Sequence, residues 1–278
     1  MQEVVCYNCQ GTDSDPYAVE NGFNLVKCRY CGLLYVNPRP AEEEIDEALR
    51  YGMHKGEQTL KTTGWYHPER VSEYVQTLGS IFPDGFPAGI KSWLDIGCGH
   101  GEFLAAIRQF GGDRVSALGI EPNRHKQMAA RKRGLNVKFF DLASHNAKYD
   151  AISILNVFSH LPDPPTTLGQ WLCLLKPGGI LILQTGDTAN LTAEMHYRPF
   201  YLPDHLSFAS EAIVTSILSG LGLRVETVHK YPFIRPSAAA FVRETIKLAW
   251  PSKSSKIRYL FRSREYVTDM YVLARAGT

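Results

Sequence analysis

Apolar strand patterns and amphipathic helix patterns alternate along this chain from residue 91 to its end. Strands are expected at 92–96, 114–120, 136–140, 150–155 and 179–184, and helices at 102–110, 124–133, 165–175 and 210–221. Strands joined through helices in this rhythm need right-handed crossovers, so they lie parallel in one sheet. Two further expected strands, 224–229 and 269–274, lack such a helix and leave room for an antiparallel edge. The alternation predicts an α/β fold with a doubly wound, Rossmann-like sheet over residues 91–278.

The first expected strand runs into three glycines, Gly97, Gly99 and Gly101, spaced as G-x-G-x-G. Glycines in such a turn let the backbone bend sharply and approach a ligand closely. The third glycine comes one residue too early for the G-x-G-x-x-G spacing of dinucleotide sites, and Asp95 at the strand end would repel a pyrophosphate. A carboxylate there suits a cofactor with a cationic aminoacyl tail.

Polar residues also stand at the ends of the next three expected strands. Glu121, followed by Pro122, is placed to accept both ribose hydroxyls of a nucleoside. Asp141, followed by Leu142, could accept an adenine amino group, although alone it is more ordinarily a helix cap. Asn156 ends the fourth strand. Because open α/β sheets bind ligands at the carboxyl ends of their strands, this succession predicts a cofactor site.

Four of the six cysteines form two close pairs, Cys6-x-x-Cys9 and Cys28-x-x-Cys31. Two thiolates at this spacing can converge on one tetrahedral Zn²⁺ at about 2.3 Å, and a second pair completes the shell. Two disulfides would instead need an oxidising compartment, and a redox pair would need a strand and a helix around it. We expect residues 1–40 to form a zinc ribbon with a structural metal, because the hydrophobic core of so small a unit is not sufficient to keep it folded.

Residues 41–90 are expected to form a helical cap between the ribbon and the core, with helices at 41–51 and 68–78. Tyr66 and Arg70 stand just before the core. They could fold over the cofactor as a lid, and a plain packing helix is the alternative.

The charge of the chain is unevenly distributed although the net value is only +2. Residues 230–264 contain nine basic residues and one acid, so this window carries +8 and the rest −6. We expect a basic helical insertion at about 233–265, which permits a phosphate-bearing partner, although a solvated helix face is the more ordinary explanation. The N-terminus lacks a signal-peptide pattern and no apolar run could cross a bilayer, so a cytoplasmic protein without a membrane partner is expected.

The runs LDIGCGHGEF, GIEPN, FFDL and LKPGG together resemble motifs of class I S-adenosylmethionine-dependent methyltransferases, over roughly residues 65–230. The cysteine pairs and the run CGLLYVNPRP resemble the zinc-ribbon subgroup that contains sugar C- and O-methyltransferases. The resemblance implies that the first motif holds the methionine part of S-adenosylmethionine, Glu121 the ribose and Asp141 the adenine. The expected cofactor-binding residues are Asp95, Gly97, Cys98, Gly99, Gly101, Phe103, Glu121, Pro122, Asp141, Leu142, Asn156, Tyr66 and Arg70.

Methyl transfer to a hydroxyl or carbon acid requires removal of a proton, for which histidine is the natural base near neutral pH. His205 lies in a loop that resembles the family's Pro-acid-His-Leu segment, and Asp204 could orient it. His160 stands where the family commonly has Glu-His, but Ser159 replaces the glutamate here. We expect His205 to be the general base and His160 a second polar group near the acceptor. The alternative is that each histidine only ties its loop to backbone carbonyls.

Three functions compete. The first is a methyltransferase for a small polar metabolite, a sugar or nucleotide-sugar. The second is an RNA methyltransferase whose ribbon reads nucleic acid, but the chain outside 230–264 is acidic and shows no stripe of alternating basic and aromatic residues. The third is a non-catalytic binding module, against which the intact set of glycines and acids argues.

Overall fold

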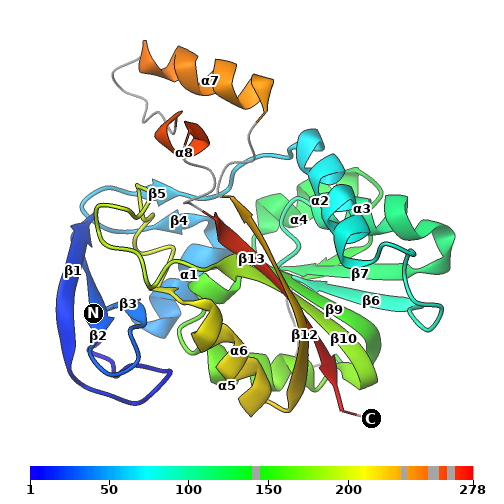
Figure 1. Ribbon diagram of the computed structural model, residues 1–278, viewed down its shortest axis with the longest axis horizontal. Coiled ribbons are helices and arrows are strands. Elements are labelled where there is room, and N and C mark those ends of the chain that lie inside the picture. Colours follow the sequence, from blue (N-terminus) through cyan, green and yellow to red (C-terminus); the bar gives the residue numbers. More distant parts are fainter. Residues whose placement is uncertain (140–144, 233–236, 250–256, 262–266, 278) are drawn as a thin grey trace.

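The computed structural model describes residues 1–139, 145–232, 237–249, 257–261 and 267–277 (Figure 1). A seven-stranded sheet with the order β12-β13-β10-β9-β6-β7-β8 forms its centre. The parallel strands are β6 (Ser92–Ile96), β7 (Ser116–Glu121), β8 (Val137–Phe139), β9 (Tyr149–Leu155) and β10 (Leu175–Gly186). The predicted Rossmann-like α/β fold is confirmed.

The antiparallel edge that the sequence left room for is also present. β13 (Val267–Ala276) lies between β10 and β12 (Leu223–Pro232) and pairs antiparallel with both. Antiparallel neighbours need no crossover helix on the sheet, so the intervening chain is free to project beyond the sheet end. It carries α7 (Ala238–Leu248) and α8 (Ile257–Phe261), which lie at the top of Figure 1.

Helices cover both faces of the sheet, as a doubly wound arrangement requires. α2 (Pro68–Ile81) and α3 (Glu102–Gly111) pack on the face that includes Trp93. α5 (Pro164–Leu172) and α6 (Glu211–Gly220) pack on the opposite face, with Leu94 and Ile96. Trp93 and Leu94 serve different faces because successive strand residues point to opposite sides. α4 (Arg124–Lys132) packs against β7 and β8.

The N-terminal unit is a meander of β1 (Ser14–Glu20), β2 (Phe23–Cys28) and β3 (Leu34–Val36). A fourth strand, β11 (Ser207–Phe208), comes from the core and pairs antiparallel with β3. The expected ribbon of residues 1–40 therefore completes its sheet with a segment far along the chain, which the sequence did not predict. This pairing covers backbone groups that β3 would otherwise leave open at its edge.

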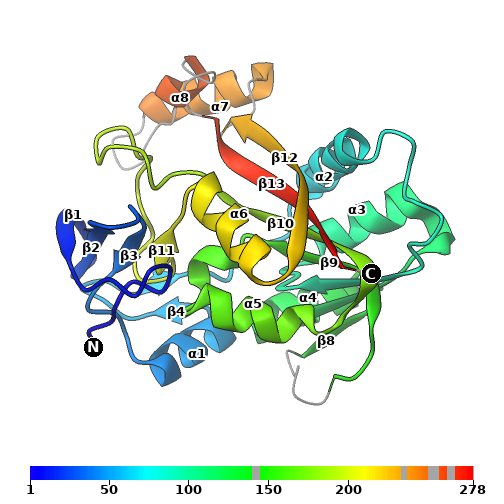
Figure 2. The ribbon, with the colours of Figure 1, turned by 60° about the horizontal axis from the view of Figure 1, so that its bottom comes forward.

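The connector consists of α1 (Glu42–Tyr51), a hairpin of β4 (Met53–His54) and β5 (Leu60–Lys61), and α2. Three glutamates in the first turn of α1 stabilise the helix by interacting with the positive end of its dipole. The helix ends at Gly52, which has a φ of 66°. The amide of Asn123, at the start of α4, donates to the carbonyl of Leu49 at 3.3 Å. In Figure 2, α1 and β4 lie below the ribbon strands. Among the described helices, none is long and apolar enough to span a membrane.

Candidate active site

The three glycines form the turn between β6 and α3. Gly97, Gly99 and Gly101 have φ values of 71°, 58° and 92°, a region that other residues rarely adopt. A Cβ on Gly97 would lie 2.4 Å from Val157, and one on Gly101 would lie 2.3 Å from Leu135. At Gly99, nothing lies within 4 Å of the same position. The turn is therefore tightly packed at its two ends and leaves space at its middle, where a ligand can approach the backbone.

Asp95 is a buried carboxylate at the start of this turn, with 2% of its surface exposed. The hydroxyl of Ser153 donates to Asp95 Oδ1 at 2.5 Å. Burial raises the pKa of Asp95 to about 7, and the hydrogen bond from Ser153 opposes that rise. A cation placed beside this carboxyl group would favour its charged form.

Glu121, at the end of β7, links the glycine turn to the start of α4. Its Oε2 accepts the backbone N–H of Gly99 at 2.8 Å, and its Oε1 accepts the backbone N–H of Asn123 at 2.8 Å. Burial raises the pKa of Glu121, while Lys126 and these two N–H groups act in the opposite direction. Each carboxylate oxygen keeps a further lone pair that a ribose hydroxyl could use.

Two of the expected cofactor residues have side chains committed to packing. Cys98 is buried in a cluster with Leu104 and Val137. Phe103 is buried edge-on against Tyr74 and Trp93, with ring centroids 5.2 and 6.1 Å away. Because both side chains are used in packing, a ligand at the turn could contact the backbone of Cys98 but neither of these side chains.

The remaining strand-end residues are placed differently. Asn156 follows β9, is exposed and has a φ of 55°, which is uncommon for a residue other than glycine. Pro122 is half-buried beside Glu121. Asp141 and Leu142 lie outside the described residues.

The segment expected to form a lid is attached to α3. The backbone N–H of His67 donates to Glu102 Oε1 at 2.9 Å. Tyr66 is half-buried, with the guanidinium carbon of Arg133 4.0 Å from its ring centroid. Arg70 is exposed on the first turn of α2. Tyr66, more than Arg70, therefore has the contacts of a covering residue.

A second polar cluster contains the predicted catalytic residues His160, Asp204 and His205. His160 lies in a short 3-10 helix, η2 (Phe158–His160), after β9. Its Nδ1 lies 3.2 Å from Asp204 Oδ1 and 2.7 Å from the carbonyl oxygen of Asp204. The rings of His160 and His205 are tilted by 53°, with 4.8 Å between their centroids.

The carboxylate of Asp204 has a further partner in His54, whose Nε2 lies 3.0 Å from the same Oδ1. The sequence led us to expect that Asp204 orients His205, but its carboxylate contacts His160 and His54. Residues 202–204 form a turn, and the N–H of His205 donates to the carbonyl of Tyr201 at 3.1 Å, so adjacent positions in the sequence do not place these two side chains as a hydrogen-bonded pair. His54 was not singled out from the sequence because it stands alone in a polar stretch without a motif.

The charges of this cluster follow from its contacts. Burial opposes the charged form of His160, but the Asp204 carboxylate outweighs burial and raises the pKa of His160 above 6.5. Burial and the neighbouring His160 lower the pKa of His205 to about 4. Burial would raise the pKa of Asp204, but the histidines hold it well below its usual range. Near neutral pH, Asp204 is charged, His205 is neutral and His160 is the more basic histidine.

The loop that carries Asp204 and His205 is held by the ribbon. The Glu20 carboxylate accepts the backbone N–H of Phe200 at 2.8 Å and that of Leu202 at 3.2 Å. The amide of Asn21 donates to the carbonyl of Leu202 at 3.1 Å. Both ribbon residues lie at the turn between β1 and β2. This turn therefore fixes the start of the loop of residues 200–206, which carries the predicted catalytic residues Asp204 and His205 and is called the catalytic loop below.

The other end of the loop is fixed from two sides at Leu206. Its carbonyl accepts the N–H of Val36 in β3 at 2.9 Å, and its N–H donates to the carbonyl of Ser159 at 2.7 Å. One residue therefore connects the ribbon to the segment that carries His160. The hydroxyls of Tyr7 and Ser207 add a contact of 3.0 Å.

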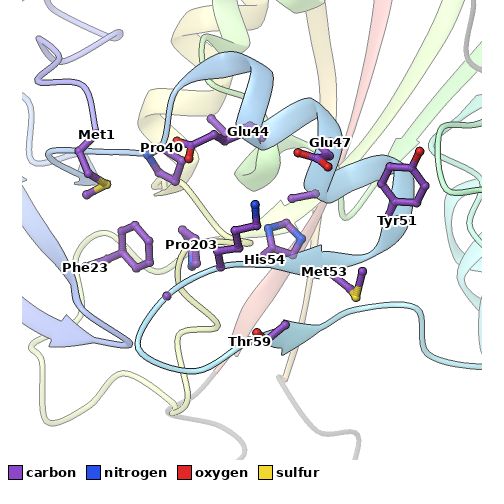
Figure 3. A pocket seen from close by; sticks show the side chains of 14 residues that line it. Met1, Phe23, Pro40, Glu44, Glu47, Tyr51, Met53, His54, Thr59 and Pro203 are labelled. Carbon is purple, nitrogen blue, oxygen red and sulfur yellow. The ribbon is translucent and has the colours of Figure 1, made fainter.

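His54 also lines a cavity of about 500 Å³ between α1, the β4–β5 hairpin and the ribbon (Figure 3). Phe23 and Pro203 lie at the side toward the ribbon and the catalytic loop, and Tyr51 and Met53 at the opposite side. Pro203 directly precedes Asp204. The cavity and the histidine cluster are thus adjacent.

The four N-terminal cysteines also meet. Their Sγ atoms all lie within 4.8 Å of one another, with 3.4 Å between Cys6 and Cys31 and 3.5 Å between Cys9 and Cys28. None of the four forms a disulfide. Burial would raise the pKa of Cys28, but backbone N–H groups of Cys31 and Tyr30 outweigh it and lower the pKa to about 7. The cluster is consistent with a zinc ribbon.

Comparison with known proteins supports the methyltransferase resemblance. A family model described as a methyltransferase domain matches residues 65–228, which is more than half of the chain. A ubiquinone biosynthesis O-methyltransferase of Serratia proteamaculans is 31% identical over 127 residues, 43% of this chain and 49% of the relative. One from Escherichia coli O157:H7 (strain EC4115 / EHEC) is 29% identical over 162 residues, 54% of this chain and 63% of the relative. The matches thus span about half to three fifths of these relatives.

Solved structures support the fold. A SAM-dependent methyltransferase from Archaeoglobus fulgidus has a TM-score of 0.51 at 19% identity and covers 74% of this chain and 94% of its own. The [4+2]-cyclase SpnF has a TM-score of 0.51 at 15% identity, with coverages of 73% and 82%. Because a cyclase shares the architecture, the fold alone does not determine the reaction, and the site must.

Proposed function

This chain belongs to the methyltransferase-domain family, and we propose that it uses S-adenosylmethionine to methylate a hydroxyl group of a small polar metabolite. The observation that carries the proposal is that two polar groups of residues share one edge of the sheet. The glycine turn follows β6 and His160 follows β9, and these strands are parallel neighbours. A cofactor held at the turn would therefore have its reactive end near the histidine cluster.

The residues at the turn fit S-adenosylmethionine, which supplies a methyl group activated by the sulfonium when bound. The space beside Gly99 admits the methionine part close to the backbone. Asp95 would pair with its ammonium group, and Glu121 would accept the ribose hydroxyls. Tyr66 would cover the bound nucleoside, and the role of Asp141 at the adenine stays a prediction.

The histidine cluster would align the acceptor hydroxyl and take its proton. The contacts of Asp204 favour His160 as the base, because an oriented imidazole with a raised pKa accepts a proton more readily. His205, whose pKa of about 4 keeps it neutral and whose ring centroid lies 4.8 Å from that of His160, would orient the hydroxyl. The two histidines thus exchange the roles that the sequence suggested.

Two resemblances support the choice of acceptor. The curated relatives are named O-methyltransferases, which supports oxygen as the methylated atom. The resemblance of the ribbon to a sugar-methyltransferase subgroup supports a sugar or nucleotide-sugar. Zn²⁺ held by Cys6, Cys9, Cys28 and Cys31 would have no open position, so its role would be structural.

Paired histidine variants test the proposal. Using labelled S-adenosylmethionine and a panel of hydroxylated metabolites, His160→Asn should lower turnover by about 10²–10⁴-fold. His205→Asn should mainly raise the KM for the acceptor, by about tenfold. Both variants should keep their affinity for S-adenosylhomocysteine within about threefold by calorimetry.

A hundredfold loss of turnover in His205→Asn alone would return the role of base to His205. Full activity of both variants would point to an amine or thiol acceptor that needs no base, and the hydroxyl proposal would then be wrong. Absence of binding to S-adenosylhomocysteine in the unmodified chain would overturn the cofactor assignment itself.

A further inference from the structure

The cavity in Figure 3 lies where an acceptor could extend away from the reacting hydroxyl. It is enclosed by α1 above and the β4–β5 hairpin below, and the ribbon closes one side. His54 contributes to the cavity wall while its Nε2 contacts Asp204. His54 and Pro203 therefore form the wall that the cavity shares with the histidine cluster.

Apolar side chains form most of the lining. Phe23, Ile45 and Ala48 are buried at the inner wall, with exposures of 6%, 5% and 7%. Side chains of this kind offer a surface for aromatic or aliphatic groups and no partners for several phosphate oxygens.

The rim of the cavity is also apolar. Tyr51 and Met53 are large hydrophobic residues that are 45% and 50% exposed, and both line the cavity. Large exposed hydrophobic side chains gathered around a concavity are typical of ligand-binding surfaces. They provide an observation that is independent of the cavity volume.

Three charged side chains line the cavity, and two of them are negative. Glu44 and Glu47 come from α1, and Lys55 comes from the hairpin. Glu44 Oε2 already accepts the backbone N–H of Ala41 at 3.0 Å, so Glu47 is the lining carboxylate without a hydrogen bond among the described residues. A diphosphate would bring at least about two negative charges to a lining with a single lysine, an unfavourable match.

We infer that this cavity binds the non-reacting part of the acceptor, and that this part is apolar or aromatic and either uncharged or cationic. The inference rests on the proposed methyl transfer to a hydroxyl group, and it revises the acceptor from a sugar or nucleotide-sugar to a hydroxylated molecule with an apolar or aromatic body. It places the body of the acceptor between α1 and the hairpin and its hydroxyl at His160. It argues against nucleotide-sugars, whose diphosphate the lining does not match.

Three phenols with the same ring and different charges test this inference. They are 4-hydroxyphenethylamine, 4-ethylphenol and 3-(4-hydroxyphenyl)propanoate, each titrated by ligand-observed NMR with S-adenosylhomocysteine present. The amine and the neutral phenol should bind about tenfold more tightly than the propanoate. Thr59→Phe, which places an aromatic ring at an exposed lining position, should weaken the two favoured probes by about tenfold.

Glu47→Gln should reduce the preference for the amine over the neutral phenol by about fivefold, and Glu43→Gln on the same helix is the matched control. Stronger binding of the propanoate, lost in Lys55→Ala, would overturn the charge assignment. Failure of all three probes to bind, or unchanged binding in Thr59→Phe, would overturn the cavity assignment. A separate result would overturn the proposed function, namely that the unmodified chain does not bind S-adenosylhomocysteine.

Discussion

The proposed cofactor side and the proposed acceptor side of the site draw their residues from the chain in different ways. On the cofactor side, Asp95, the glycine turn and Glu121 come from the neighbouring strands β6 and β7 and the turn between them. On the acceptor side, His160 and Asp204 are 44 positions apart, and His54 comes from a hairpin outside the sheet. The first side is a property of the sheet, whereas the second depends on how the ribbon and connector dock onto it.

This difference teaches that the two sides can be disturbed separately. The glycine turn is held by Glu121, within the core. The catalytic loop is held by Glu20, Asn21 and Val36, all in the N-terminal unit. A change in the ribbon should therefore reach the acceptor side and leave the cofactor side intact, and a change at β7 should do the reverse.

The largest separate effect is expected from Cys28→Ser, which removes one of the four proposed zinc ligands. A ribbon without its metal has too small a core to stay folded, so β3 can no longer pair with β11. Turnover should fall by about a hundredfold or more, while affinity for S-adenosylhomocysteine stays within about threefold. Hydrogen exchange should increase at Phe200, Leu202 and Leu206 and stay unchanged in β6.

Cys173→Ser is the matched control, because Cys173 is an exposed thiol outside the cluster. It should keep its zinc, measured by metal analysis, and its turnover. Normal exchange protection of the catalytic loop in zinc-free Cys28→Ser would show that the ribbon does not hold the loop.

The reverse separation is expected from Glu121→Ala. The variant loses the proposed bonds to the ribose and the observed bonds to Gly99 and Asn123. A hydrogen bond to a charged group contributes about 1.5–3 kcal/mol, so calorimetry should show affinity for S-adenosylhomocysteine lowered by about tenfold or more. Exchange in the catalytic loop should not change. An unaltered affinity would remove Glu121 from the cofactor site.

The same contrast explains how far the sequence could predict the site. Gly97, Gly99, Gly101 and Glu121 stand at strand ends whose spacing is visible in the sequence, because a parallel sheet brings its carboxyl ends to one edge. The four cysteines were equally visible, since two C-x-x-C pairs at this separation are typical of a four-cysteine zinc site. Each of these predictions depends on a short stretch of sequence and on a local structure that recurs in many proteins, either the end of a parallel strand or a C-x-x-C pair.

The acceptor side depends on contacts that no spacing records. Nothing in the sequence of Ser207 and Phe208 indicates that they pair with β3. Asp204 stands next to His205, which suggested a pair, but its carboxylate reaches His160 and His54 instead. Docking between distant segments is decided by tertiary packing, so the sequence located the catalytic loop but not its partners.

A smaller effect, but a specific one, is expected for Asp204→Asn. The carboxylate raises the pKa of His160, so the acidic limb of the rate profile should lie at higher pH than an ordinary histidine would give. A base must be neutral to accept a proton, and activity therefore rises with pH through this pKa. Without the charge the pKa of His160 falls, the limb moves to lower pH, and the plateau rate drops by about tenfold through lost orientation. A limb that does not move would mean that His160 is not the titrating base.

The smallest effect is expected for Glu20→Gln, which tests the contact between ribbon and loop without removing the ribbon. An amide offers one accepting oxygen where the carboxylate offers two, so it cannot accept from both Phe200 and Leu202 as Glu20 does. The loss of one hydrogen bond to a charged acceptor should lower the free energy that holds the loop in place by about 1.5 kcal/mol. The value of kcat should then fall by roughly tenfold or less. The KM for S-adenosylmethionine should not change.

Glu43→Gln is the control for this variant, because Glu43 is an exposed residue of α1 that makes the same change of charge. Equal losses of kcat in the two variants would assign the effect to net charge rather than to the loop. A combined Glu20→Gln and Asn21→Ala variant should lose more than either single variant but less than Cys28→Ser, because β11 still pairs with β3 in it. If the combined variant instead equals Cys28→Ser, the turn between β1 and β2 alone positions the catalytic loop and the strand pairing adds nothing to it.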